Sequence, residues 1–554
     1  MMVYWRMEQT ACDRRLAVPY VNTDDSKIAF EKLLRSPYFV DKTGLIGALA
    51  PRIDTEQSYV CITRPRRFGK TVNARMLACF LSRGLSAEPL FEGLEVSRDG
   101  AAMAHLGAHD VIYIDFSRLP QRCEGYGDYL SAITDGVIAD LREAFPEASI
   151  PEDERDLFAA LDTAFSKTGA RFCFVMDEWD SMFFNELFTE GDRRAFLMFL
   201  KQLLKGRPYV EFAYMTGILP IAKHSTGSEL NMFDEYSAVD DPLFDRFFGF
   251  TEDEVRGLCA RHAARACGAR VGYEGLARWY DGYITETGRH MFNPRSVALA
   301  LERDQLKSYW TESGPYDEIY YYVRNDVDAV RDDLVRMVAG EPVEAQMKNY
   351  AASAMSLTTR DEIFSAMAVY GFLTYHEGRV SIPNHELMLK FRDVLAKEEM
   401  GYVARLARRS REMLAATLRG DAEAMADVIA AAHDQEVPLL RYANEADLAA
   451  LVNLVYLAAR DRYLVRREEP AGRGVADVAF VPADPADAEC RPFVVELKAG
   501  GTAAGAVAQI RERNYPALFA DELTGESRYA RRPLAVGIAW DPKTKLHECL
   551  VEEL

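Results

Sequence analysis

Short apolar runs alternate with longer amphipathic stretches between residues 59 and 216. The runs lie at 59–63, 111–116, 172–176 and 210–216, and the amphipathic stretches between them lie at about 125–145, 155–167 and 191–205. Runs of this length predict buried strands, whereas apolar residues at helical spacing predict helices. Strands that alternate with helices predict a parallel sheet with helices on both of its faces.

The rest of the chain divides into a helical middle part and a mixed C-terminal part. Residues 300–440 are predicted to be mostly helical, with a hairpin at 373–382 between two helices. This order suggests a winged-helix-like module, which could enter a DNA groove or serve as a protein–protein scaffold. The few charges on the wing favour the scaffold. We therefore predict three domains, at residues 1–240, 241–440 and 441–554.

The segment Arg64-Pro-Arg-Arg-Phe-Gly-Lys-Thr71 joins the first predicted strand to a helix. Backbone N–H groups in such a loop, together with the helix dipole, favour a bound phosphate. Lys70 would contact the β- and γ-phosphates, and the Thr71 hydroxyl would bind Mg²⁺. The other predicted contacts from the loop are Arg66, Arg67, Phe68 and Gly69. Because Arg64 replaces the first glycine of G-x-x-x-x-G-K-[ST], an ordinary strand–turn–helix is the alternative.

A second acidic motif follows the run at 172–176, which ends in Asp177-Glu178. In a nucleoside triphosphatase, Asp177 would hold Mg²⁺ through water and Glu178 would activate the attacking water. Thr216, at the end of the next run, would sense the γ-phosphate or have a purely structural role. A strand capped by a solvated acidic turn is the alternative, but the combination with a phosphate loop favours an ATPase.

The last predicted domain carries side chains suited to metal-assisted phosphodiester hydrolysis. Glu496 and Lys498 lie two residues apart in an apolar run, so both would face the same side of a strand. Asp477 would join them if its strand forms a hairpin with theirs. Asp477 and Glu496 would then bind Mg²⁺ or Mn²⁺, and Lys498 would position or activate water. Glu445 could be a further metal ligand, while a solvated strand with alternating charges is the alternative.

Composition and charge narrow the class of protein. Apolar residues make up 49% of the chain and charged residues 27%, which is typical of a globular protein. The net charge of −20 argues against nonspecific coating of nucleic acid, so such binding would need a local basic groove. The nine cysteines form no C-x-x-C pair or Cys/His cluster along the sequence, which suggests neither a disulfide framework nor a zinc site. Without an evident signal peptide or membrane span, we expect a cytoplasmic protein with no membrane partner.

Several motifs, taken together, resemble one bacterial family. They are Tyr38-Phe-Val-Asp-Lys-Thr43, the phosphate-loop segment, Asp177-Glu178-Trp-Asp180, Thr216-Gly-Ile-Leu-Pro-Ile-Ala-Lys223, Phe248-Gly-Phe-Thr-Glu-Asp-Glu-Val255 and Trp279-Tyr-Asp-Gly-Tyr283. The family consists of predicted AAA-ATPase-like proteins with a C-terminal PD-(D/E)XK nuclease-superfamily domain. The resemblance covers nearly the whole chain and implies ATP as the nucleotide. Gln509 and Tyr515 resemble the trailing motif of the nuclease superfamily, and Arg246 or Arg295 could neutralise charge at the γ-phosphate.

The predicted fold class is α/β. A P-loop NTPase parallel sheet with a helical lid would precede a winged-helix-like middle region and a C-terminal α/β restriction-endonuclease-like domain. We expect an ATPase that uses ATP and Mg²⁺, coupled to a metal-dependent nuclease that acts on DNA or RNA, with defence against foreign nucleic acid as one setting. A homo-oligomer is compatible with this. The alternative is a non-catalytic ATP-dependent switch or scaffold whose C-terminal domain only binds nucleic acid or a protein partner.

Overall fold

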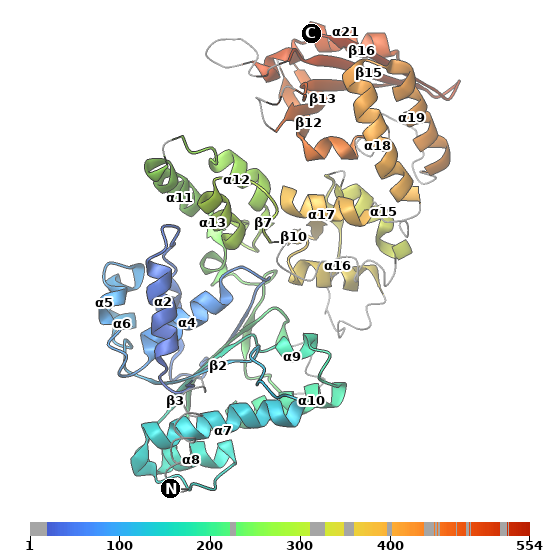
Figure 1. Cartoon of the computed structure of the whole chain (residues 1–554). Coiled ribbons are helices and arrows are strands. Elements are labelled where there is room, and N and C mark those ends of the chain that lie inside the picture. Colours follow the sequence, from blue (N-terminus) through green and yellow to red (C-terminus); the bar gives the residue numbers. More distant parts are fainter. Residues whose placement is uncertain are drawn as a thin grey trace, which may run out of the picture. The chain divides into compact units, whose positions relative to one another are not determined.

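The computed structural model describes most of the chain, and the described residues fall into two compact units (Figure 1). The first unit holds the described residues of 1–315 and 344–386, and the second holds those of 316–343 and 387–554. The predicted middle domain, 241–440, is therefore divided between the two units. The described residues are 19–221, 229–266, 268–310, 327–338, 340–347, 359–395, 402–436, 448, 451–452, 455–471, 474–483, 487, 489–520, 529 and 531–554.

A five-stranded parallel sheet lies at the centre of the first unit. Its strands are β1 (Tyr59–Thr63), β2 (Asp110–Asp115), β3 (Phe172–Asp177), β4 (Val210–Gly217) and β5 (Asp234–Tyr236). Their order is β2-β3-β4-β1-β5, and every pairing is parallel. The carboxyl ends of β1 and β3 therefore lie at the same edge, where open α/β sheets bind ligands. The parallel sheet predicted from the apolar runs is confirmed.

Helices cover this sheet, with α2 and α4 on one face and α7 and α8 on the other (Figure 1). The helices of this part are α2 (Asp24–Leu34), α3 (Gly44–Leu49), α4 (Lys70–Leu81), α5 (Glu88–Phe91), α6 (Gly100–Met103), α7 (Tyr126–Ala144), α8 (Leu157–Thr168), α9 (Ser181–Phe184) and α10 (Glu190–Leu204). Leu77 and Phe80 of α4 share a buried cluster with Val60, Val175 and Tyr214 of the sheet. Burial of each such side chain contributes about 1.5–3 kcal/mol, which holds the start of α4 against the sheet.

A small lid follows the sheet within the first unit. It contains α11 (Glu252–Arg265), α12 (Tyr273–Tyr280), α13 (Pro294–Arg303) and the strands β6 (Phe250–Thr251), β7 (Tyr283–Ile284) and β8 (His290–Phe292). Val255, Leu276 and Tyr280 belong to its separate buried core. The Tyr283 ring meets the edge of Phe68 with ring centroids 4.8 Å apart. The lid therefore contacts the predicted phosphate loop through aromatic packing.

A helix, a hairpin and another helix follow in the predicted order. They are α16 (Arg360–Val369), β10 (Thr374–His376), β11 (Arg379–Ser381) and α17 (His385–Leu395), and β9 (Val343–Glu344) joins the hairpin to complete a three-stranded sheet. Glu377 and Gly378 both have positive φ, at 47° and 80°. Two such residues in succession are typical of the tight turn in a two-residue hairpin. The order of these elements is the predicted one, and a winged-helix-like fold for this region stays a prediction.

The second unit is built on a five-stranded mixed sheet. Its strands are β12 (Tyr463–Ala471), β13 (Gly474–Pro482), β14 (Phe493–Ala499), β15 (Leu534–Asp541) and β16 (Leu546–Glu553), and its helices include α15 (Val327–Val338), α18 (Tyr402–Arg419), α19 (Ala422–Glu436) and α21 (Ala503–Glu512). β14 and β15 pair in parallel, and the other neighbours pair antiparallel. A Cβ at Gly537 would lie 2.2 Å from the Ala503 carbonyl oxygen, so glycine permits α21 to lie directly on β15.

Among the described residues, no helix is long and apolar enough to cross a lipid bilayer. The cysteines that the structure describes are free thiols.

Candidate functional site

The loop between β1 and α4 has the backbone shape of an anion site. Arg67 and Gly69 adopt φ angles of 72° and 90°, on either side of Phe68. Such alternation turns successive N–H groups toward one side of the chain, which is a common way to bind phosphate oxygens. A Cβ at Gly69 would meet nothing within 4 Å, so glycine is required there by its φ angle rather than by space.

The Lys70 side chain is buried beneath this loop. Its ammonium group donates hydrogen bonds to the carbonyl oxygens of Arg64, at 3.0 Å, and Pro65, at 3.1 Å. Burial lowers the pKa of Lys70, while the neighbouring carboxylates of Glu178, Asp180 and Asp177 raise it. The amine therefore lies within electrostatic reach of the acidic end of β3, as the two predicted motifs require.

Arg64, which replaces the first glycine of the phosphate-loop pattern, anchors the loop from behind. Its guanidinium is buried, forms an ion pair with Asp241, and donates a 3.0 Å hydrogen bond to the Tyr236 carbonyl. It also lies over the Phe248 ring, 4.9 Å from the centroid. The side chain thus fastens the loop to β5 and the segment after it, which explains why an arginine is accommodated at this position.

Asp177 is fully buried at the carboxyl end of β3. Its carboxylate accepts hydrogen bonds from the Tyr113 hydroxyl, at 3.3 Å, and from the backbone N–H of Glu178, at 3.1 Å. Burial, followed by Glu178 and Asp115, raises the pKa of Asp177 to about 7, whereas a hydrogen bond from Thr71 and the charge of Lys70 lower it. The structure therefore brings Asp177 to Thr71, the two residues predicted to hold Mg²⁺.

Two further carboxylates follow Asp177. Glu178 has a left-handed backbone, with φ of 52°, and lines the cleft described below. Such a conformation is uncommon for a non-glycine residue and costs free energy. Asp180 is fully buried and accepts backbone hydrogen bonds from Ile218, at 2.8 Å, and Leu219, at 2.7 Å. It therefore joins the end of β3 to the turn after β4.

Asp180 is a functional candidate to which sequence reasoning assigned no role. One of its oxygens, Oδ1, is buried and has no hydrogen-bond partner among the described residues. Burial and the nearby Glu178 raise the pKa of Asp180 to about 6. Its place in an acidic motif was visible in the sequence, but its contacts with the turn after β4 depend on the fold.

A cleft of about 780 Å³ opens over the phosphate loop. Its lining includes polar and charged residues, which we call the polar end: Arg66, Arg67, Gly69, Lys70, Thr71, Glu178 and Arg295. It also includes apolar and aromatic residues, which we call the apolar end, together with Ser36 and Lys42: Leu33, Tyr38, Phe39, Val40, Phe250 and Leu299. A cationic end beside an apolar end suits a ligand that carries phosphates on a flat organic group, and the volume is typical of a ligand site.

Arginine side chains gather at the polar end. Burial lowers the pKa of Arg67, the nearby charges of Arg295 and Arg66 lower it further, and Glu178 raises it. Arg246 lies elsewhere: its guanidinium stacks on Phe247, 4.6 Å from the ring centroid, and does not line the cleft. Of the two arginines considered from the sequence, Arg295, at the start of α13, is the one at the cleft.

Thr216 is placed differently from the other predicted contacts. It is fully buried in β4, and its hydroxyl donates a 2.8 Å hydrogen bond to the Ile62 carbonyl of β1. Ile218 lines the cleft, whereas Thr216 does not. The Thr216 hydroxyl therefore links β4 to β1 in this structure. A phosphate-sensing role for Thr216 stays a prediction that this geometry does not favour.

The second unit brings together most of the predicted acidic site. Val478 of β13 and Val495 of β14 form the last pair of the ladder. Asp477 directly precedes Val478, and Glu496 directly follows Val495. The backbone N–H of Leu497 donates a 2.8 Å hydrogen bond to Asp477. The two carboxylates therefore lie opposite each other at the end of the antiparallel pair. Glu445 lies outside the described residues.

Glu496 is the most constrained residue of this site. It is 2% exposed, and its Oε1 contacts the Lys498 ammonium, at 3.4 Å, and the Gln509 amide. Its Oε2 is buried without a partner among the described residues. Burial and the charge of Asp477 raise the pKa of Glu496 to about 7, while Lys498 and Arg513 lower it. A partnerless oxygen beside a second carboxylate fits a divalent cation.

The two residues of the predicted trailing motif have different positions. Gln509, on α21, contacts Glu496 through its amide. Tyr515 instead donates a 2.7 Å hydrogen bond to the Val475 carbonyl and accepts one from Arg513, at 3.3 Å. Gln509 therefore belongs to the acidic site, and Tyr515 supports the start of β13.

Comparison with known proteins concerns the part of the chain that holds the first of the two sites. Residues 28–226 match the protein family described as predicted AAA-ATPase. This segment is an AAA-ATPase-like domain. It contains the whole phosphate loop and the Asp177-Glu178 motif, so the ATPase-like domain holds the polar end of the cleft apart from Arg295. An uncharacterized protein in the vnfD 5′ region of Azotobacter chroococcum mcd 1 is 28% identical over 286 residues, which are 50% of this chain and 51% of that protein.

Two solved structures show weak likenesses. A Walker-type ATPase of Pyrococcus abyssi matches 60% of this chain and 90% of its own, with 12% identity and a TM-score of 0.31. The ORC2 protein of Aeropyrum pernix, solved in ADPNP–ADP complexes, matches 64% of this chain and 92% of its own, with 11% identity and a TM-score of 0.32. The assignment of the ATPase-like domain rests on the family match and on the geometry of the loop. The matched part of the chain spans about half the length of the curated relative from Azotobacter.

Proposed function

We propose that the cleft of the ATPase-like domain binds ATP with Mg²⁺ and hydrolyses its terminal phosphoanhydride bond. The observation that carries this proposal is the convergence of Lys70, Thr71 and Asp177 below a cleft with a cationic and an apolar end. The apolar end would take the adenine base. The loop N–H groups and Lys70 would bind the phosphates.

The residues at the polar end would divide the work of hydrolysis. The buried carboxylate of Asp177 and the hydroxyl of Thr71 lie next to each other and together would hold Mg²⁺. The ion would neutralise charge on the β- and γ-phosphates. Glu178 would accept a proton from the attacking water and orient it in line with the leaving oxygen. Arg66, Arg67 and Arg295 would stabilise the charge that develops on the transferred phosphoryl group. Asp180 would position Glu178 by fixing the end of β3.

The test of this proposal separates ATP binding from ATP turnover. Lys70→Ala should abolish binding of a fluorescent ATP analogue, because the phosphates lose the buried cation. Glu178→Gln should retain binding and lose turnover, since the amide cannot accept the proton from water. Wild-type hydrolysis with full activity in both variants would refute the assignment. Binding without turnover in the wild type would favour a non-catalytic ATP-dependent switch.

We propose a second activity for the acidic site in the C-terminal unit, metal-dependent hydrolysis of phosphodiester bonds in DNA or RNA. The buried Oε2 of Glu496, which has no partner within the described part of the chain, lies beside Asp477 and supports this activity. Asp477, Glu496 and the Leu497 carbonyl would hold Mg²⁺ or Mn²⁺, which would stabilise negative charge on the phosphate. Lys498 would position the attacking water, and Gln509 would hold Glu496 in place.

Cleavage assays with single- and double-stranded DNA and RNA test this activity. Cleavage should require Mg²⁺ or Mn²⁺ and should disappear in Glu496→Ala. The control is Glu552→Ala, which removes a carboxylate from β16 of the same sheet. If the wild type cuts none of these substrates, or if Glu496→Ala cuts equally well, the nuclease proposal fails while the ATPase proposal stands. Coupling of the two activities, a defence role and homo-oligomer formation remain predictions beyond this test.

A further inference from the structure

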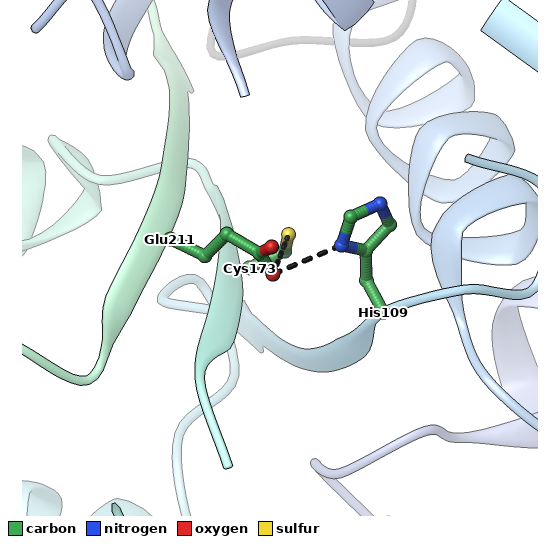
Figure 2. A group of neighbouring side chains, drawn as sticks. All are labelled: His109, Cys173 and Glu211. Carbon is green, nitrogen blue, oxygen red and sulfur yellow. Dashed lines mark hydrogen bonds and ion pairs between the residues drawn. The ribbon is translucent and has the colours of Figure 1, made fainter. Parts of the chain in front are cut away.

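Three potential metal ligands meet at the edge of the central sheet opposite the phosphate loop. His109 directly precedes β2, Cys173 is the second residue of β3, and Glu211 is the second residue of β4 (Figure 2). The three strands are neighbours and parallel, so their amino ends lie side by side. This group takes no part in the proposed ATPase chemistry, which uses the carboxyl ends of the strands.

The ligand atoms are already close to the spacing of a coordination shell. His109 Nδ1 lies 2.9 Å from Glu211 Oε2, Cys173 Sγ lies 3.8 Å from the same oxygen, and all three ligand atoms lie within 4.8 Å of one another. Around a tetrahedral zinc ion, neighbouring N, O and S ligands stand roughly 3.3–3.8 Å apart. Two of the three distances are therefore within about half an ångström of this spacing, and side-chain shifts of up to about 1 Å would accommodate the ion.

The second nitrogen of the histidine has the partner that metal-binding histidines require. His109 Nε2 lies 2.9 Å from His105 Nδ1, and the two rings stack with centroids 5.1 Å apart. A hydrogen bond from Nε2–H to His105 leaves the Nδ1 lone pair of His109 directed toward Glu211 and Cys173. Such outer contacts fix the tautomer and orientation of a ligating histidine. His105 would act as a positioning residue.

Burial and nearby charge also suit a cation. Cys173 is 0% exposed and His109 is 7% exposed, while the Glu211 side chain, at 19%, is open enough to admit an ion. The adjacent cation, Arg171, is paired with Asp54 at 2.5 Å, which offsets its charge. A purely structural histidine–glutamate hydrogen bond would need no thiol at this point.

We propose that His109, Cys173 and Glu211 bind a zinc ion or another transition-metal ion of similar preference. An imidazole, a thiolate and a carboxylate form a mixed set that suits Zn²⁺ and excludes Mg²⁺, which prefers oxygen ligands. The bound ion would displace the thiol proton of Cys173. It would link the amino ends of three strands and leave one coordination position for water or a small ligand.

Cobalt substitution provides the probe, because Co²⁺ bound to a thiolate has a near-ultraviolet charge-transfer absorption that oxygen-only sites lack. Metal-free full-length protein titrated with Co²⁺ should develop this absorption to one equivalent, and Zn²⁺ should displace it. Cys173→Ser should abolish the absorption. Glu211→Gln, which retains the side-chain shape, should weaken Co²⁺ binding at least about 10-fold, and His105→Ala should weaken it roughly 10- to 100-fold.

Controls distinguish this site from adventitious thiol binding. Cys79→Ser, at an equally buried position in α4, should keep the absorption and its stoichiometry. Zn²⁺ should raise the melting temperature of the wild type and of Cys79→Ser by the same amount, and should raise that of Glu211→Gln by less, because a weaker site contributes less stability at the same Zn²⁺ concentration. No thiolate absorption in folded wild type, or an equal absorption in Cys173→Ser, would overturn the proposal and leave a structural hydrogen-bonded cluster.

Discussion

Asp177 and Glu496 are buried carboxylates in two unrelated sheets, and both have a pKa near 7. Burial is the main cause in each case, and a neighbouring carboxylate adds to it. Their hydrogen bonds differ. Both oxygens of Asp177 accept hydrogen bonds, from Tyr113 and from the Glu178 backbone, whereas Oε2 of Glu496 has no partner among the described residues.

The number of hydrogen bonds that each carboxylate accepts indicates how it could bind a metal ion. Both oxygens of the Asp177 carboxylate already accept hydrogen bonds, and the carboxylate lies next to Thr71. It therefore fits a metal ion that is held largely through water, with the substrate phosphates as further ligands. A carboxylate with one partnerless oxygen fits direct coordination. A raised pKa therefore points to a functional site, but the pattern of partners indicates the chemistry.

The largest effect should come from the residue that would activate water. Glu178→Gln should reduce ATP turnover by roughly 10²–10⁴-fold, because general-base catalysis is worth about that much. Binding of the ATP analogue should remain within a few-fold of wild type. Glu186→Gln, an exposed neighbour on the same segment, is the matched control and should leave steady-state turnover unchanged. Equal losses in both variants would contradict the assigned role.

The lid arginine should have the next largest effect on turnover. Arg295→Ala should lower kcat by roughly 10²-fold, less than the 10³–10⁵ of a dedicated arginine finger because Arg66 and Arg67 remain nearby. Arg246→Ala provides the comparison, since that side chain stacks on Phe247 outside the cleft. If steady-state assays show the larger loss for Arg246→Ala, the lid does not act as described.

The anchor of the loop can be tested through stability. Arg64→Ala would leave the buried Asp241 carboxylate without its ion pair, which typically costs about 3–5 kcal/mol. Thermal unfolding should show a clear drop in melting temperature, and the paired variant Arg64→Met/Asp241→Leu should recover part of it. An unchanged melting temperature for Arg64→Ala would mean that the loop has another anchor.

A smaller effect should appear in the pH dependence of the metal-free protein. The folded-state pKa of Asp177, about 7, lies above its ordinary value of 3.8, so the folded protein binds the extra proton. Its stabilising contribution is complete below pH 4 and is lost as the pH rises toward 7, by at most about 4 kcal/mol. Asp177→Asn should flatten the fall in melting temperature between pH 5 and 8. A fall as steep as in the wild type would place the titrating group elsewhere.

Patterns within short stretches of sequence predicted the strands, helices and hairpins, because these elements depend on residues that are near one another in the chain. The apolar run before Lys70 and the amphipathic stretch after it predicted β1 and α4, because each pattern reports burial on one segment. Asp477 and Glu496 were placed together because an antiparallel hairpin aligns nearby strands. The role of Arg64 was missed, since its contacts with Asp241 and Tyr236 depend on how the chain returns to the loop.

The features that the sequence did not predict depend on contacts between distant segments. His109, Cys173 and Glu211 lie 38 to 102 residues apart in the sequence, and strand order alone brings them together. The cysteine spacing therefore gave no sign of a metal site. The fold of the lid likewise places Arg295 at the cleft and leaves Arg246 outside its lining, and no pattern in the sequence distinguished the two arginines.

Anomalous diffraction from crystals soaked with Mn²⁺ and a non-hydrolysable ATP analogue tests the central claim most directly. The account predicts one manganese peak between the β- and γ-phosphates, Thr71 and Asp177, and a second between Asp477 and Glu496. An analogue bound away from Lys70, or a fully loaded crystal with no manganese at either pair of residues, would contradict it.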